Sequence, residues 1–167
     1  PLLLLPYPLH NRIFELRTSA WQLASKPGEL PPYDESVLDR EVQLFPDWYI
    51  ARHRNIQLSD DQRNRLQRTF KHIIRRNLAQ PSVYVHRDFM PRNLMVSNPS
   101  PGVLDFQDAL YGPISYDVAC LFKDAFVSWE EERVLDWTIR YWEKARKAGL
   151  PVPADFAQFF EDVEWMG

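Results

Sequence analysis

The sequence predicts a mainly helical α+β protein, and three observations point to this class. Apolar residues recur at helical spacing before and after one short segment, residues 83–106. Within that segment, β-branched and aromatic residues form three short runs instead. Turn-forming residues, 97–102, separate the second run from the third. We therefore expect helices packed around a short β-hairpin.

The composition excludes several classes of protein. The 167 residues suffice for one domain with a sizeable core, and 45% apolar content with 14% aromatic residues is typical of folded globular proteins. A net charge of −3 gives no general attraction to the phosphate backbone of nucleic acids. Cys120 is the only cysteine in the sequence, so no internal disulfide can form, and we expect a cytoplasmic protein.

The two ends of the chain suggest a fragment. Leu2 to Leu5 form an apolar run, but Pro6 and Pro8 interrupt it far short of the roughly 20 residues that span a bilayer, so no membrane partner is expected. The first residue is not Met, and the last expected helix stops on an apolar stripe. We therefore expect residues 1–167 to be one lobe of a longer polypeptide, truncated at both ends.

Periodicity and capping residues predict the first helices. Residues 9–25 show helical spacing, which the Lys-Pro-Gly sequence at 26–28 should terminate. Asp34 is a suitable N-cap for a second helix that runs to Phe45, and Pro46 should end it.

Aromatic residues gather at the end of this second helix. We expect Phe45, Trp48 and Tyr49 to pack in the core or between helices, and contact with a sugar is the alternative for Trp48 and Tyr49. Glu41, on the same helix, is expected on a solvated face, with substrate contact as its alternative.

Residues 59–78 carry the clearest helical pattern. Ser59 and Gln62 form a capping box at its start. One face is apolar and contains Leu66, Phe70, Ile73 and Ile74. The opposite face is basic and contains Arg63, Arg65, Arg68, Lys71, Arg75 and Arg76. No aromatic residues that could stack with bases alternate with them, so we expect a solvated face and no nucleic-acid partner.

Further helices are expected after the hairpin. The first runs from Asp117 to about residue 126. The second follows a capping box of Ser128 and Glu131, runs to residue 148 and ends at Gly149 in a Schellman-like stop. The last begins at Ala154.

The hairpin should gather polar side chains at one end. The runs at 94–96 and 103–106 flank the turn and should pair as antiparallel strands. Asn93 enters the first strand and Asp105 leaves the second, so pairing brings them close together, while Asp88 lies in the preceding loop. Two carboxylates and one amide then converge.

This group of side chains suits phosphoryl transfer. Mg²⁺ prefers oxygen ligands and keeps several waters, so Asn93, Asp105 and substrate phosphates can hold it. Asp88 can then accept the proton of an attacking hydroxyl. The spacing His86-Arg87-Asp88, four residues, then Asn93 is that of the catalytic loop of protein kinases, and Asp105 stands in the place of the metal-binding Asp of their Asp-Phe-Gly sequence. ATP and Mg²⁺ are the expected cofactors.

Residues 83 to about 123 resemble the aminoglycoside phosphotransferase and choline kinase-like family. Two features separate them from protein kinases: Gln107, not Gly, follows Asp105 and Phe106, and a second motif, residues 112–119, comes soon after. The resemblance implies the helical C-terminal lobe of a protein kinase-like fold. Nothing before residue 83 matches the glycine-rich loop or the Lys of a β-rich N-terminal lobe, so we expect that lobe to be absent and the segment alone to be inactive.

The resemblance also implies roles for neighbouring residues. Asp117 is expected to brace the catalytic loop, with His86 and Arg87 as further structural support. Gln107 stands where some relatives have a Glu near the metal, and Arg92 could reach a substrate or phosphate anion.

Similarity at residues 30–34 and 44–49 points to the bacterial kinases that phosphorylate amino sugars, N-acetylmuramate and N-acetylglucosamine, at the anomeric hydroxyl in cell-wall recycling. The expected partners are this small-molecule substrate and the missing N-terminal lobe. One alternative is an aminoglycoside or choline-type kinase. A metal-dependent hydrolase with His86, Asp88 and Asp105 as ligands is a second alternative, and a non-catalytic kinase-like binding module is a third.

Overall fold

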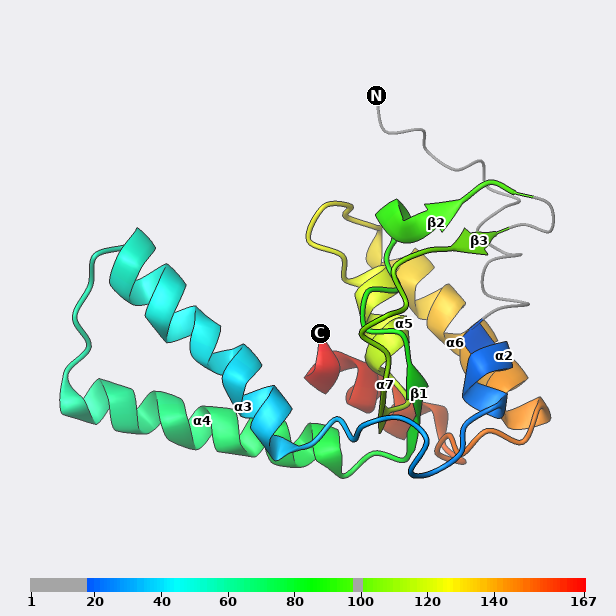
Figure 1. Cartoon of the computed structure of the whole chain (residues 1–167), viewed down its shortest axis with the longest axis horizontal. Helices are drawn as coiled ribbons and strands as arrows, with labels where there is room; N and C mark the ends of the chain where they lie inside the picture. The colour runs from blue at the N-terminus through cyan, green and yellow to red at the C-terminus, as the bar shows by residue number, and fades with distance from the viewer. Residues whose placement is uncertain (1–17, 98–100) are drawn as a thin grey trace.

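The structure, a computed structural model, describes residues 18–97 and 101–167. These residues are mostly helical and form two small antiparallel sheets, which confirms the α+β class. Figure 1 shows a long helical hairpin that projects to one side of a body, and the body contains both sheets and the C-terminal helices. We call the projecting hairpin, residues 35–78, the helical arm.

The described chain begins with α2 (Thr18–Leu23), which packs against β1 (Ser82–Val85). The helix expected over residues 9–25 falls mainly outside the described residues. Its described part ends before Lys26, as the Lys-Pro-Gly sequence predicts. α2 therefore covers one side of the strand that leads into the candidate site.

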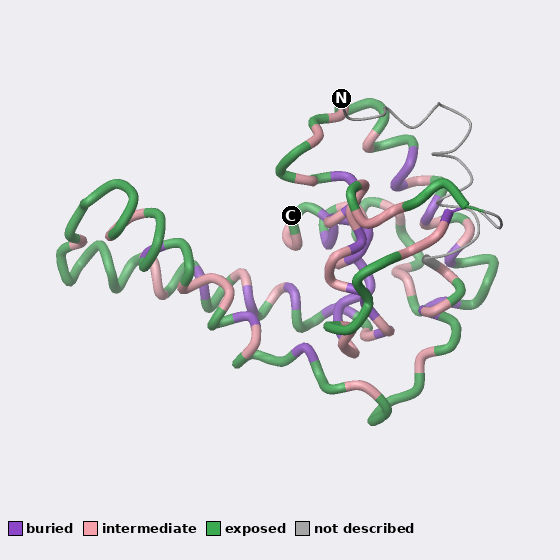
Figure 2. Tube along the Cα trace, turned by 45° about the horizontal axis from the view of Figure 1, so that its top comes forward, coloured by how far each residue is buried: buried purple, intermediate pink, exposed green. Residues whose placement is uncertain are grey.

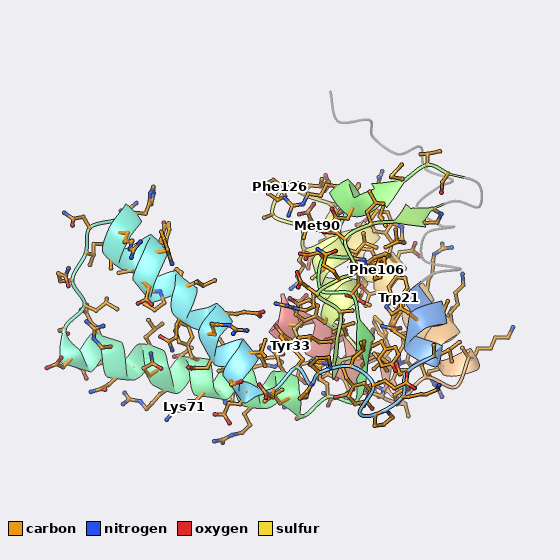
Figure 3. The ribbon with its side chains drawn as sticks, in the orientation of Figure 1. Trp21, Tyr33, Lys71, Met90, Phe106 and Phe126 are labelled. Atoms are coloured by element: carbon orange, nitrogen blue, oxygen red, sulfur yellow. The ribbon has the colours of Figure 1, made fainter. Side chains whose placement is uncertain are left out.

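Residues 31–33 are the extended last part of the link between α2 and the arm. The backbone N–H of Tyr33 donates to the carbonyl of Tyr111 at 2.8 Å, and the N–H of Tyr111 donates to the carbonyl of Pro31 at 2.9 Å. The link thus runs alongside a strand of the body, and it fixes Tyr33 where the arm begins (Figure 3).

Side-chain caps start both long helices of the arm, as predicted. Asp34 accepts hydrogen bonds from two backbone N–H groups in the first turn of α3 (Glu35–Leu44). Ser59 and Gln62 form the expected capping box at the start of α4 (Asp60–Leu78), with distances of 3.3 and 2.9 Å. Short polar side chains satisfy N–H groups that the first turn leaves free, so local sequence sets these starts.

Pro46 does not end the helical path, contrary to the expectation. The chain continues directly after α3 as a π-helix, η1 (Phe45–His53), and Pro46 lies in its first turn. Proline lacks the N–H group that a helix interior uses, but the first turn does not need that group. Pro46 therefore ends the α-helical pattern and begins a wider helix.

The aromatic residues of η1 are not in the core, which corrects a second expectation. Phe45, Trp48 and Tyr49 are 47%, 56% and 48% exposed. Within η1, all of which is described, Pro46 is the one buried residue, because the arm carries η1 away from the body (Figure 2). The side chains contact each other instead: Phe45 stacks on Tyr49, and the guanidinium of Arg52 lies 4.0 Å from the ring centre of Trp48.

The predicted hairpin is present. β2 (Leu94–Met95) pairs antiparallel with β3 (Gly102–Val103). Both strands are shorter than the runs 94–96 and 103–106, because the chain leaves the sheet after Val103. A second sheet, which the sequence analysis did not predict, pairs β1 antiparallel with β4 (Leu110–Pro113). This pairing places the loop that follows β1 beside the segment that follows the hairpin.

The helices after the hairpin start or end at different residues than expected. α5 (Tyr116–Phe122) stops before residue 126. α6 (Glu131–Lys147) has Glu130 as its N-cap, and no side chain among the described residues caps it, so the predicted capping box of Ser128 and Glu131 is wrong. Trp129 packs edge-on against Trp137 and sets the chain path before α6, so packing replaces the cap.

The end of α6 agrees with the prediction. Gly149 has a φ of +82°, its N–H donates to the carbonyl of Arg146, and the N–H of Leu150 donates to the carbonyl of Ala145 at 2.9 Å. These are the two hydrogen bonds of a Schellman motif. The last helix, α7 (Phe156–Met166), then packs against α4, α5 and α6.

The main core lies in the body. It is formed by β1 and the C-terminal helices and contains Val85, Phe89, Ile114, Val118, Tyr141, Phe159 and Val163. A smaller apolar cluster of Tyr33, Leu38 and Ile74 joins the arm to the body. Among the described residues, every helix is too short or too polar to cross a membrane.

Candidate active site

One buried carboxylate holds the loop that follows β1, residues 86–93. Asp117, in the first turn of α5, accepts hydrogen bonds from the backbone N–H groups of His86 at 2.9 and 3.0 Å and of Arg87 at 3.1 Å. The indole of Trp21 in α2 also donates to Asp117, at 3.2 Å. A single side chain thus connects the 86–93 loop with α5 and α2.

The environment of Asp117 changes its acidity. Burial raises the pKa of its carboxyl group to about 6, although the N–H donors of His86, Arg87 and Trp21 favour the charged form and act against this rise. The carboxyl group is therefore ionised at neutral pH and becomes protonated in mildly acidic solution.

His86 lies inside the body and not on the surface of the site. It is 4% exposed, and its ring centre lies 6.0 Å from those of both Trp21 and Phe89. Burial lowers the pKa of His86, while the Asp88 carboxylate and the backbone of Leu104 oppose this effect. Neither ring nitrogen makes a hydrogen bond of normal geometry with a described residue. His86 is thus placed as a packed, neutral ring beneath the loop.

Asn93 connects the loop with the hairpin. Its side-chain Nδ2 donates to the backbone carbonyl of Asp88 at 2.8 Å. The backbone carbonyl of Asn93 accepts a hydrogen bond from the N–H of Leu104 at 3.0 Å. Leu104 immediately precedes Asp105 in the chain. The structure therefore brings Asp88, Asn93 and Asp105 to the same end of the hairpin, as expected from the pairing of β2 and β3.

Asp105 has an unusual backbone conformation. Its φ is +71°, in the left-handed region that few residues other than glycine adopt. The residue is exposed, and the side-chain Nε2 of Gln107 donates to its Oδ1 at 2.7 Å. Gln107 therefore lies beside the expected metal ligand and orients it.

The donor atoms at this end of the hairpin fit Mg²⁺. Because Asn93 uses its NH₂ group on the Asp88 carbonyl, its amide oxygen remains as an acceptor for a cation, and Asp105 supplies a carboxylate. The hydrolase alternative needed His86, Asp88 and Asp105 as three ligands. No group of three His, Cys, Asp or Glu side chains that could hold a metal occurs among the described residues.

Arg87 and Glu41 form an ion pair that changes the interpretation of Glu41. The Nη2 atom of Arg87 donates to Oε1 of Glu41, and both side chains are largely shielded from solvent. Glu41 is therefore not on a solvated face of α3, as the sequence suggested. It contacts the 86–93 loop from the base of the arm.

Other candidate residues lie apart from this group. Trp48 and Tyr49 are exposed on η1, in the arm. Arg92 is exposed in the loop, and its guanidinium lies 5.0 Å from the ring centre of Phe126. Trp48 and Tyr49 therefore lie away from Asp88, Asn93 and Asp105, whereas Arg92 directly precedes Asn93 in the chain and its side chain lies against Phe126.

Sequence reasoning missed two side chains that touch the loop or its partners. Trp21 donates to Asp117, and the hydroxyl of Tyr33 donates to Oε2 of Glu41. A signal for Tyr33 was available, because the stiff Pro-Pro sequence at 31–32 fixes the path of the chain just before it. No comparable feature of the sequence marked Trp21, because a single aromatic residue in a helical pattern usually packs in the core.

Comparisons with known proteins identify relatives of this chain. The model of the APH family, a phosphotransferase enzyme family, matches residues 18–156. A protein from Neisseria meningitidis named N-acetylmuramate/N-acetylglucosamine kinase is 57% identical over 146 residues, which are 87% of this chain and 44% of that protein. Proteins of the same name from Pseudomonas aeruginosa and Pseudomonas putida are 55% and 54% identical, over 89% and 83% of this chain.

The chain spans less than half the length of these curated relatives, 44% of the first two and 41% of the third. The family match covers most of the chain and includes the 86–93 loop, the hairpin and α5. It confirms the resemblance that these motifs indicated. The chain therefore belongs to the phosphotransferase enzyme family.

Proposed function

We propose that the full-length protein transfers the γ-phosphate of ATP to a hydroxyl of an amino sugar, N-acetylmuramate or N-acetylglucosamine, at the anomeric position. The observation that carries this proposal is the convergence of Asp88, Asn93 and Asp105 at one end of the hairpin. The names of the three relatives support the choice of substrate.

Each residue of the group has a part in the proposed reaction. Asp88 orients the acceptor hydroxyl and accepts its proton as the bond to phosphorus forms. Asn93 and Asp105 would hold Mg²⁺, which supplies positive charge next to the transferred phosphoryl group. Asp117 keeps the 86–93 loop in place through the backbone of His86 and Arg87.

The proposal treats this chain as the helical C-terminal lobe of a two-lobed kinase. The residues that would cover the ATP phosphates then belong to a β-rich N-terminal lobe of the same polypeptide. This agrees with the share of the relatives that the chain spans. Residues 1–167 alone are accordingly expected to have no kinase activity, and tests of function require the full-length protein.

The substrate can be tested directly. Full-length protein would be incubated with ATP, Mg²⁺ and a panel of N-acetylmuramate, N-acetylglucosamine, an aminoglycoside and choline, and the products would be analysed by mass spectrometry. We expect one phosphate to be added to the amino sugars, at the anomeric oxygen. Phosphorylation of the aminoglycoside or choline alone would contradict the amino-sugar assignment, and ATP-independent cleavage of phosphate esters would favour the hydrolase.

The role of Asp88 gives the first residue-level prediction. Asp88→Asn in the full-length protein should lower the turnover number by roughly 10²- to 10⁴-fold, because an amide cannot accept the proton of the acceptor hydroxyl. Unfolding by urea should change little, since the hydrogen bond that Asn93 donates goes to the backbone carbonyl of Asp88, which this variant keeps. Near-normal turnover in this variant would show that Asp88 is not the base.

A further inference from the structure

Both carboxylate oxygens of Glu41 have partners, and the partners come from different parts of the chain. Oε1 pairs with the guanidinium of Arg87 in the 86–93 loop, and Oε2 accepts a hydrogen bond from the hydroxyl of Tyr33. The side chains of Arg87 and Glu41 are 25% and 30% exposed. Ion pairs that are shielded to this extent are weakened less by solvent than surface pairs.

Arg87 needs such support, because its backbone is in the left-handed region, with a φ of +75°. For a residue with a side chain this conformation costs roughly 1–3 kcal/mol, and it persists only where the surroundings fix it. The N–H of Arg87 donates to Asp117, and its carbonyl lies 3.3 Å from the thiol of Cys120. The guanidinium is held by the charge of Glu41, with Tyr116 as a hydrogen-bond partner and the ring centre of Tyr33 5.8 Å away.

Tyr33 gives Glu41 a rigid partner. Tyr33 is 3% exposed, its backbone pairs with Tyr111, and its ring lies edge-on to Tyr116 with the centres 5.1 Å apart. A Cβ atom on Gly112 would lie 2.6 Å from the Cβ of Tyr33, so glycine is required there for this close approach. Tyr33 therefore cannot shift toward β4, and its hydroxyl has a fixed position.

We propose that Tyr33, Glu41 and Arg87 act as a positioning relay, in which Glu41 sets the backbone next to Asp88 from the base of the helical arm. The proposal rests on the proposed function, since it assigns to Glu41 a part in the same site. Glu41 does not touch the reacting atoms. It acts through Arg87, the residue that directly precedes Asp88 in the chain.

The relay predicts a specific kinetic effect for Glu41→Gln in the full-length protein. This change removes the charge of Glu41 but keeps its shape, so Arg87 loses its ion pair. We expect kcat to fall by about tenfold to a hundredfold, because a small misplacement of a reacting group has effects of this size. The KM values for ATP and for the amino sugar should change less than about twofold, as expected when an interaction acts on the chemical step.

Two comparisons isolate the relay. Glu35→Gln removes an exposed carboxylate from the same helix and should leave kcat unchanged. Tyr33→Phe removes the hydroxyl that contacts Glu41 and Tyr116, and it should lower kcat in the same direction but less. The double variant Glu41→Gln with Arg87→Gln should be no slower than the worse single variant, because the two residues act as one unit.

A second readout does not depend on activity. Hydrogen exchange of the backbone amides in residues 86–90 should become faster in Glu41→Gln and in Tyr33→Phe, but not in Glu35→Gln. A rise in the KM for the amino sugar at constant kcat would overturn the relay, because Glu41 would then bind substrate. Unchanged exchange and unchanged kcat in both variants would also overturn it. If the wild-type protein phosphorylates no compound of the panel, the proposed function is wrong. The exchange measurement still shows whether Glu41 and Tyr33 stabilise the backbone of residues 86–90.

Discussion

Arg87 and Asp105 share a backbone conformation that is rare for residues with side chains. Among the described residues other than glycine, the positive φ angles belong to Asn55, Arg87 and Asp105. Two of these three lie at the candidate site, one beside the proposed base and one at the proposed metal ligand. Strained residues of this kind concentrate at functional sites, where neighbouring contacts keep them in place. The strain is thus independent support for the location of the site.

The conformation of Asp105 allows a clean test of its charge. Asn adopts the left-handed region about as readily as Asp, so Asp105→Asn should keep the backbone and change only the ligand charge. We expect the Mg²⁺ concentration for half-maximal activity to rise by about tenfold or more, because a neutral amide holds a hard cation less tightly. The measurement is a Mg²⁺ titration of kinase activity in the full-length protein.

Asp108→Asn is a suitable control for this titration, since Asp108 is also exposed and lies in the same segment. It should leave the Mg²⁺ requirement unchanged. An equal shift in both variants would mean that the effect comes from the general negative charge of the segment. In that case Asp105 would not be a specific ligand.

Asp117 makes stability depend on pH in a predictable direction. Its pKa rises from the ordinary value of 3.8 to about 6 because the carboxyl group is buried. Between these two values the folded state holds the proton and the unfolded state does not, so stability falls as the pH rises through this window. The rise in pKa corresponds to roughly 3 kcal/mol. Ionised Asp117 is therefore a cost to folding at neutral pH, and the loop contacts it makes are retained in spite of that cost.

The variant Asp117→Asn should lack this pH dependence. The free energy of unfolding of the wild type, minus that of the variant, should increase by roughly 3 kcal/mol as the pH falls from about 7 to about 4. Urea unfolding at several pH values, followed by tryptophan fluorescence, measures this difference. Other titrating groups cancel in the comparison. A difference that stays constant, or that decreases toward acid, would contradict the raised pKa.

At the level of elements, the sequence correctly predicted those helix starts and ends whose hydrogen bonds join residues close together in the chain. Asp34, the capping box of Ser59 and Gln62, and the stop at Gly149 all involve residues within a few positions of each other. Such interactions can be inferred from sequence, because the partners are fixed by spacing alone. The pairing of β2 with β3 could be inferred in the same way, because only a few turn-forming residues separate the two strands in the sequence.

The elements that depend on distant contacts were not predicted. β4 pairs with β1 across 25 or more residues, and neither its sequence nor its length marks it as a strand. The start of α6 follows the packing of Trp129, which overrides the local capping signal. The π-helix after Pro46 is exposed, so no periodic burial pattern marks it.

The same distinction applies to the candidate site. Asp88, Asn93 and Asp105 could be grouped from sequence, because they flank one hairpin. The contact between Glu41 and Arg87 spans 46 positions, and it requires the complete fold. Nothing in the local sequence of α3 distinguishes Glu41 from an ordinary exposed glutamate.

The stop at Gly149 gives a prediction at this scale. Gly149 has a φ of +82°, and no atom lies within 4 Å of a Cβ added there, so Gly149→Ala costs only the strain of the backbone. We expect a loss of about 1 kcal/mol in the free energy of unfolding and no change in activity. The control is Ala148→Ser at the preceding exposed position, which has an ordinary φ of −79° and should have little effect. Equal effects of the two changes in urea unfolding would argue against the backbone explanation.

At the scale of the whole molecule, apolar burial is unevenly distributed. The main core is in the body, whereas the arm is attached through the small cluster of Tyr33, Leu38 and Ile74. Leu38 is the one buried residue in α3, and the buried residues of α4 lie from Phe70 onward. The outer arm, which we define as η1 and residues 60–69 of α4, thus has few contacts that resist local opening. Regions with few buried apolar contacts open more easily than the core.

This distribution predicts graded hydrogen exchange in the full-length protein. Amides of the outer arm should exchange at least about tenfold faster than those of α6 and α7, because each 1.4 kcal/mol of opening free energy changes the rate by a factor of ten. Leu38→Ala should speed exchange in the arm and leave α6 unchanged, since it weakens only the small cluster. Val163→Ala, in the main core, should instead speed exchange throughout the body. Uniform protection across arm and body would contradict a division of the molecule into a stable body and a loosely attached arm, because the two parts would then open as one cooperative unit.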